Sequence, residues 1–224
     1  MEKFKNWFQK NLWFISGGFI VIIVALTLYL IFGNPSKKSE TYHKYTTYEI
    51  YNETNKLVYD SIKLALLNEV DRYILEIAPT SSLSGLVIIN NCIKYDIDIC
   101  FVLSQAEQES HFGTQGLARK TNSVFNVYAF DGHDYNMVNK NGKYDHPNDC
   151  VEPYLRLLKR DYLVDGKTEY DLMLNYVNKN GSRYASSETY EEALQKSFAR
   201  IKSTTNIDTF AQELNKYRLM LGIN

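Results

Sequence analysis

The chain has 224 residues, of which 45% are hydrophobic and 23% are charged. This composition fits one medium-sized folded domain with a short attachment and excludes a largely disordered chain. The formal net charge is −1, without the basic excess of a nucleic-acid-binding domain, so we expect no nucleic-acid partner.

The cysteines and tyrosines give weaker signals. Cys92, Cys100 and Cys150 form no CxxC pair and accompany no histidine cluster, so we predict no metal site and no cofactor. Either Cys92 and Cys100 pair in an oxidising compartment, or the thiols are free and buried. The 18 tyrosines suit a packed core or an oligosaccharide groove, and we assign most of them to the core.

An uncharged stretch, Leu12 to Phe32, follows a short basic N-terminal segment of residues 1–11. It has the ~20 apolar residues that a helix needs to span a bilayer, so we predict a transmembrane helix. A cleaved signal peptide is the alternative, but its apolar region is normally only ~7–15 residues long. Lysines flank the stretch almost equally on both sides, so the positive-inside rule leaves the orientation open.

Residues 33–55 are polar without periodicity and are predicted to form a tether, with a folded domain over residues 56–224. Apolar residues recur at helical spacing from Leu57 to Ile77, before Pro79. This pattern predicts a helix that either packs on the domain or acts as a stalk. The apolar stripe favours packing.

Two predicted helices lead to the candidate site. A short apolar helix runs from Leu86 to Ile93, and Asp98 is the expected N-cap of the next helix. That second helix carries a buried stripe ending near Ala106, and Glu109 lies beside the stripe. Glu107 points elsewhere, so we expect it to be solvated.

After Gly113 the chain reads as a loop, followed by a polar stretch from Asp131 to Lys143 that contains the hairpin signal Asn-Gly. Further helices are predicted over residues 149–162, 169–177, from 186 or 187 to 201, and 207–221. The predicted fold is therefore a mainly α, α+β domain with a small β-hairpin lobe.

Glu109 is the candidate catalytic residue. It falls in the last turn of its helix, where unpaired carbonyl groups and apolar neighbours disfavour a negative charge. A raised pKa is what a general acid needs near neutral pH. An ordinary exposed glutamate at a helix end is the alternative.

Four segments, in order, resemble the glucosaminidase family of the lysozyme superfamily, glycoside hydrolase family 73. Ser104–Thr114 resembles the family's AQxxLESGWG segment, and Asn122–Val127 resembles NNLFG. Tyr144–Tyr154 looks like Y-D-S-x-x-x-S-I-x-x-Y, and Gly181–Tyr190 looks like the Y-A-T-D-x-x-Y loop.

The resemblance implies a lysozyme-like fold that cleaves β-1,4 bonds of peptidoglycan, with Glu109 as the general acid. It places Tyr184 and Tyr190 at the active site, although core packing is an alternative for both. We also place Phe125 at the substrate-binding site. Gln105, one turn before Glu109, is expected to orient that acid, to contact the sugar, or to pack in the core.

The chain departs from the family pattern at three places. His111-Phe112 replaces Gly-Trp, and Phe125-Asn126 replaces Phe-Gly; asparagine tolerates left-handed backbone, so the turn is expected to survive. The family's second glutamate is missing, which leaves Asp131 and Asp134 as available carboxylates. The substrate's N-acetyl group could replace the second acid, and a one-acid lytic transglycosylase is also compatible.

These observations predict a membrane-anchored peptidoglycan hydrolase of N-acetylglucosaminidase type. Its expected partners are glycan strands and, through residues 12–32, the lipid bilayer. Because peptidoglycan lies outside the cell membrane, this function selects a cytoplasmic N-terminus and a domain on the wall side. The alternative from another class is a non-catalytic wall-binding scaffold with a degenerate site.

Overall fold

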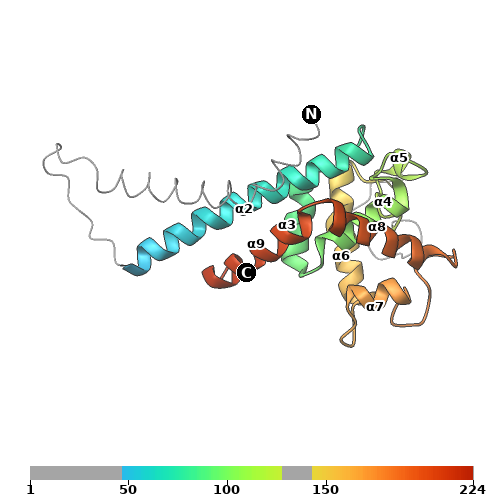
Figure 1. Ribbon diagram of the computed structural model, residues 1–224. Helices are drawn as coiled ribbons and strands as arrows, with labels where there is room; N and C mark the ends of the chain where they lie inside the picture. The colour runs from blue at the N-terminus through green and yellow to red at the C-terminus, as the bar shows by residue number, and fades with distance from the viewer. Residues whose placement is uncertain (1–46, 128–142, 224) are drawn as a thin grey trace, which may run out of the picture. The chain divides into compact units, whose positions relative to one another are not determined.

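The computed structural model describes residues 47–127 and 143–223, which form a mainly helical domain (Figure 1). The predicted mainly α class is confirmed for these residues, which contain no β-strand and only an isolated antiparallel bridge between Val177 and Arg183. The elements are α2 (Thr47–Ile77), α3 (Gly85–Tyr95), α4 (Ile99–Ser110), α5 (Ala118–Thr121), η1 (Pro147–Cys150), α6 (Val151–Leu157), η2 (Leu158–Tyr162), α7 (Glu169–Leu174), α8 (Tyr190–Thr204) and α9 (Ile207–Leu221).

Some predicted features lie outside the described residues. These are the transmembrane helix of residues 12–32, the first part of the tether, and nearly all of the hairpin lobe with Asp131 and Asp134. None of the helices in the described part of the chain is long and apolar enough to cross a membrane. The last part of the predicted tether, residues 47–55, is helical because α2 begins at Thr47.

Helix α4 is the buried centre of the domain. Asp98 is its N-cap, as predicted: the carboxylate accepts hydrogen bonds from the backbone N–H groups of Cys100 at 2.7 Å and Phe101 at 3.4 Å. The helix packs against α3, α8 and α9. Its fully buried apolar side chains are Phe101, Val102, Leu103 and Ala106, together with Cys100.

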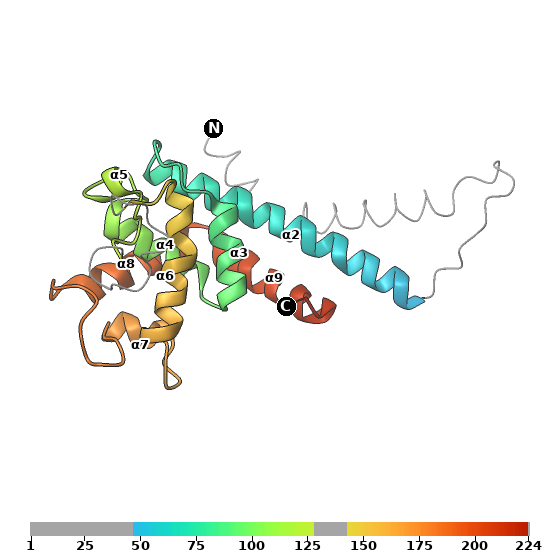
Figure 2. The same cartoon turned by 180° about the vertical axis from the view of Figure 1, so that it is seen from behind.

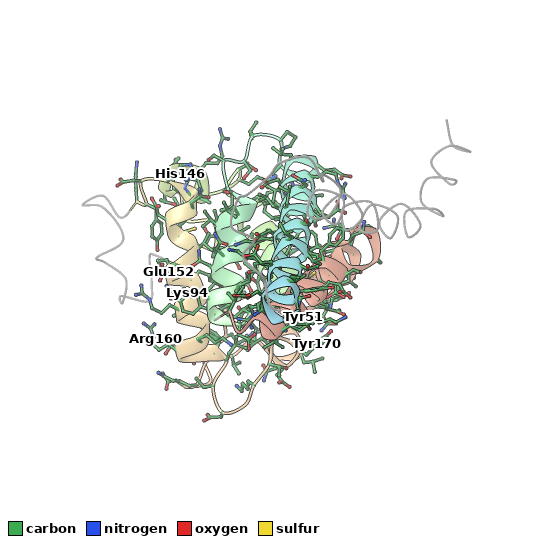
Figure 3. The ribbon with its side chains drawn as sticks, turned by 90° about the vertical axis from the view of Figure 1, so that its left-hand side faces the viewer. Tyr51, Lys94, His146, Glu152, Arg160 and Tyr170 are labelled. Carbon is green, nitrogen blue, oxygen red and sulfur yellow. The ribbon has the colours of Figure 1, made fainter. Side chains whose placement is uncertain are left out.

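Helix α3 begins close to α2, at Gly85. The Gly85 N–H donates to Asp71 Oδ1 at 2.8 Å, and a Cβ at residue 85 would lie only 2.6 Å from the same oxygen. On its other side α3 lies beside α6, which is clearest from behind (Figure 2). Lys94 of α3 and Glu152 of α6 form an ion pair at 2.6 Å across this contact (Figure 3).

Glu107 is not solvated, contrary to the prediction. Its carboxylate accepts hydrogen bonds from Tyr73 Oη of α2 at 2.6 Å and from Ser197 Oγ of α8 at 2.8 Å, and it pairs with the Arg200 guanidinium. The Glu107 side chain is 13% exposed. The prediction was wrong because α2 and α8 cover a face of α4 that helical periodicity alone assigned to solvent.

Many tyrosines are core residues, as expected. Tyr144, Tyr154 and Tyr176 are fully buried. Phe125 stacks on Tyr154 with ring centroids 3.8 Å apart, and Tyr176 stacks on Tyr184 at 4.5 Å. All three cysteines are buried free thiols, so Cys92 and Cys100 do not pair.

Candidate active site

Glu109 lies in the last turn of α4, where the sequence placed it. At the end of the helix, His111 N–H donates to the Glu107 carbonyl at 2.9 Å, and Phe112 N–H donates to the Ala106 carbonyl at 3.0 Å. His111 and Phe112 both adopt left-handed backbone, with φ of 52° and 55°. The Phe112 ring, at the family's tryptophan position, is buried against Tyr73. The chain therefore turns sharply just after Glu109, which leaves its carboxyl group at the helix end.

Two neutral groups donate hydrogen bonds to the Glu109 carboxylate. Tyr190 Oη, at the start of α8, donates to Oε1. Asn126 Nδ2 donates to Oε2 at 3.1 Å and also to the Glu109 carbonyl oxygen at 2.8 Å. The carboxylate is thus held from two sides by segments that are far apart in sequence.

Gln105 fixes the direction of the Tyr190 hydrogen bond. Its Nε2 donates to Tyr190 Oη at 2.6 Å, while its Oε1 accepts from Tyr176 Oη at 2.8 Å. Since the Tyr190 oxygen already accepts a hydrogen bond from an amide, its own proton is free to point at Glu109. Gln105 is fully buried, and its two hydrogen bonds are those of a residue that orients Tyr190.

The loop carrying Asn126 is pinned to the end of α4. Ser110 Oγ donates to the Val124 carbonyl at 2.7 Å and accepts from Gly113 N–H at 2.8 Å. Gly113 has a φ of 83°, and a Cβ there would lie 3.2 Å from the Val124 side chain. Asn126 has a φ of 53°, so the left-handed turn survives the loss of the family's glycine, as predicted.

Sequence reasoning missed the contact between Asn126 and Glu109. The available signal was the departure from the family pattern at this position, because Asn126 brings an amide side chain where the family has glycine. The participation of Tyr176 had no signal in the sequence, since it depends on the packing of the segment between α7 and α8 against α4.

Tyr184 and Phe125 support the same loop. Tyr184 Oη donates to the Phe125 carbonyl at 2.8 Å, and the half-buried Tyr184 ring packs against the rings of both Tyr176 and Tyr190. The Phe125 side chain is fully buried against Tyr154. In the described residues this side chain supports the loop by packing, and its contact with substrate stays a prediction.

Burial raises the pKa of Glu109 above the ordinary glutamate value, in the direction expected of a general acid. Hydrogen bonds from Tyr190 and Asn126 favour the ionised form and offset part of this effect. Burial and the Glu109 charge also raise the pKa of Tyr190, which keeps it a neutral donor.

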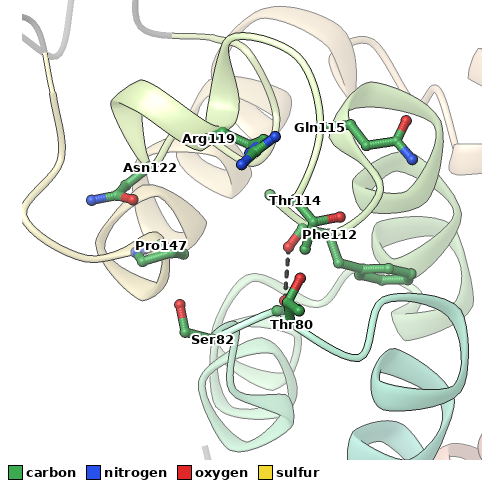
Figure 4. A pocket seen from close by; sticks show the side chains of 10 residues that line it. Thr80, Ser82, Phe112, Thr114, Gln115, Arg119, Asn122 and Pro147 are labelled. Atoms are coloured by element: carbon green, nitrogen blue, oxygen red, sulfur yellow. Dashed lines mark hydrogen bonds between the residues drawn. The ribbon is translucent and has the colours of Figure 1, made fainter.

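A separate polar cleft of about 540 Å³ adjoins the loop that follows α4 (Figure 4). It is lined by residues 80–82 and 112–115 together with Arg119, Asn122 and Pro147, so Arg119 is its charged residue. Ser81 Oγ donates to the Phe112 carbonyl at 2.7 Å across its floor. Glu109 is not among the residues that line this cleft, so the cleft and the Glu109 carboxyl group are separate features.

Comparison with protein-family models matches residues 86–203 to the Glucosaminidase family, described as mannosyl-glycoprotein endo-beta-N-acetylglucosaminidase. The chain belongs to this family. The match extends from α3 into α8, covers more than half of the chain, and includes Glu109, Asn126 and Tyr190. Searches of curated proteins and of solved structures give no significant match. The family membership confirms the resemblance found in the sequence, and the chain is a glycoside hydrolase that acts on peptidoglycan.

Proposed function

We propose that this glucosaminidase-family enzyme cleaves the glycan strand as an N-acetylglucosaminidase, with Glu109 as its general acid. The observation that carries the proposal is the setting of the Glu109 carboxyl group. It is largely buried at the end of α4, and its hydrogen-bond donors are neutral. In the described part of the chain no lysine or arginine pairs with it. Such an acid retains its proton to higher pH than an exposed glutamate does.

The two hydrogen-bond donors, Tyr190 and Asn126, also stabilise Glu109 after it has lost its proton. When Glu109 transfers its proton to the leaving glycosidic oxygen, it becomes a carboxylate. Tyr190 Oη and Asn126 Nδ2 are already placed on its two oxygens, so the charge that develops meets preorganised hydrogen bonds. Burial thus favours the starting acid, and the donors favour the ionised product of the transfer.

Two groups are candidates for the second reactive group beside Glu109: a carboxylate of the enzyme and the N-acetyl group of the substrate. Asp131 or Asp134 would act as the second carboxylate, or the substrate's own N-acetyl group would attack the anomeric carbon. Asp131→Asn and Asp134→Asn separate these routes. Loss of turnover in one variant identifies the carboxylate, whereas full turnover in both favours the N-acetyl route.

We further propose that residues 12–32 anchor the enzyme in the cell membrane, with the N-terminus cytoplasmic and the domain on the wall side. The uncharged sequence of this stretch supports the anchor, and the location of peptidoglycan supports the orientation. Protease added outside intact protoplasts should then remove the domain; protection of the domain would reject this orientation.

The decisive experiment uses the full chain in mild detergent with purified peptidoglycan and identifies the products by mass spectrometry. New reducing-end N-acetylglucosamine is expected, whereas 1,6-anhydromuramic ends would identify a lytic transglycosylase. Glu109→Gln should lower turnover at least about a hundredfold, because it removes the proton donor. Glu188→Gln, on the loop before Tyr190, is the matched control. Unchanged turnover in Glu109→Gln would reject the assignment, and binding without turnover by the unaltered chain would indicate a degenerate site.

A further inference from the structure

Helix α2 carries apolar side chains on two opposite faces. One face packs into the domain through Tyr59, Leu66 and Val70, which are buried. The other face presents Ile50, Leu57 and Leu64, residues that are 43%, 51% and 59% exposed. At 100° per residue the two sets lie on opposite sides of the helix. The N-terminal part of α2 also reaches past the other helices (Figures 1 and 2).

The exposed set has the spacing of a coiled-coil seam. Positions 50, 54, 57, 61, 64 and 68 alternate in steps of four and three, which makes Ile50, Leu57 and Leu64 d positions and Thr54, Ser61 and Asn68 a positions. Thr54 Oγ1 donates to the Ile50 carbonyl and Ser61 Oγ to the Leu57 carbonyl, both at 2.8 Å. Their hydroxyl protons are satisfied within the helix, so these two residues can face another helix without losing a donor bond to water.

We propose that this seam, residues 50–68 of α2, pairs with the same seam of a second copy of the chain in a parallel two-helix coiled coil. A heptad seam fits another helix through knobs-into-holes packing, and a copy of itself matches it in length and register. The domain packs on the b and f positions, such as Asn55 and Tyr59, which face away from the seam. Two domains can therefore flank the paired helices without blocking them.

Charge selects the parallel orientation. The g positions carry Glu53 and Asp60, whereas the e positions are the uncharged Tyr51, Val58 and Ala65. An antiparallel pair sets g positions against g positions and brings these acids together, whereas a parallel pair sets them against uncharged e positions. A parallel pair also places both N-termini at one end. That agrees with the proposed anchoring of both copies in one membrane, which the seam does not require.

Single cysteines test the pairing in the full chain, in detergent and in membranes. Ile50→Cys, Leu57→Cys and Leu64→Cys each place a thiol on the seam, and Lys56→Cys, an exposed c position on the same helix, is the matched control. The native cysteines are buried, so the background is low. Mild oxidation should give at least about fivefold more disulfide-linked dimer in each seam variant than in the control, since a disulfide forms only between close Cβ atoms.

The pattern of cross-links decides the outcome. Cross-linking at all three seam positions supports the parallel pair, because every residue then meets its own copy. Cross-linking at only one position indicates an antiparallel crossing and overturns the proposal. Dimer no greater than the control at any position also overturns it, and means that lipid or another segment of the chain covers the seam. Turnover of peptidoglycan by the same variants shows that they are folded, so a failed pairing would leave the proposed catalytic function standing.

Discussion

Two glutamates separated by one residue on α4 have opposite roles. Glu107 meets an arginine, a tyrosine and a serine and therefore belongs to an ion pair that joins helices. Among the described residues Glu109 meets only neutral donors, and burial raises its pKa. The environment of each carboxylate decides its role, because the two side chains are chemically identical.

Asn126→Gly tests how the site controls its acid. Glycine adopts a φ of 53° without strain, so the turn should be kept. Removing the amide takes a hydrogen bond from the ionised form and therefore raises the pKa of Glu109 further. Since the active form is protonated, the alkaline limb of the profile of kcat/KM against pH should move to higher pH. Turnover near neutral pH should fall about tenfold, because the developing carboxylate loses one donor.

The control for this variant is Asp165→Gly. Asp165 is an exposed residue, also left-handed with a φ of 56°. Its replacement should leave both turnover and the pH profile as they are. An alkaline limb that stays in place in Asn126→Gly would mean that the amide only shapes the loop.

Interactions at its two ends stabilise helix α4. At the N-terminus Asp98 satisfies two backbone N–H groups, and its carboxylate lies 3.7 Å from Lys202 of α8. At the C-terminus the left-handed His111 and Phe112 close the last turn and set the exit of the chain. Because Glu109 lies in that last turn, fraying of α4 would displace the acid before it unfolded the domain.

Asp98→Ala should lower the free energy of unfolding by about 1 kcal/mol, since it leaves the first N–H groups of α4 without a side-chain acceptor. Chemical denaturation of the full chain in detergent measures this change. Asp98→Asn keeps a capping oxygen but not the charge near Lys202, so it should recover most of the loss. Equal destabilisation in both variants would assign the effect to the lysine instead of the cap.

At the scale of the whole molecule, the Glu107 cluster joins three helices around the site. Tyr73 comes from α2, Glu107 from α4, and Ser197 and Arg200 from α8. Tyr190, the donor to Glu109, lies at the start of the same α8. The position of α8 therefore sets both the stability of the domain and the geometry of the acid.

Glu107→Ala should lower the free energy of unfolding by about 2 kcal/mol, because it leaves Tyr73, Ser197 and Arg200 without their shared acceptor. Glu109→Gln should leave the unfolding free energy nearly unchanged, since glutamine has the size of the protonated acid and keeps an acceptor oxygen. Unfolding curves and turnover measured on both variants check this division. Loss of turnover without loss of stability in Glu107→Ala would show that Glu107 also acts in the chemistry.

The sequence by itself determined the helices and the candidate acid. Helical periodicity located the main helices, although α2 begins earlier and α8 begins at Tyr190, a few residues after the predicted Ser186 or Ser187. A capping aspartate and an apolar stripe were enough to place Glu109 in the last turn of α4. Four ordered segments then indicated the family to which the chain belongs. Each of these signals lies within a short continuous stretch of residues, so it can be recognised in the sequence alone.

Only the tertiary structure decided what surrounds Glu109. The partners Asn126 and Tyr190 lie 17 and 81 residues away in the chain, and no periodicity relates them to α4. The same holds for the burial of Gln105 and Phe125 and for the packing of α2 and α8 over Glu107. A helix shows in its sequence which face is apolar, but the elements that cover its other faces are chosen by packing across the whole domain.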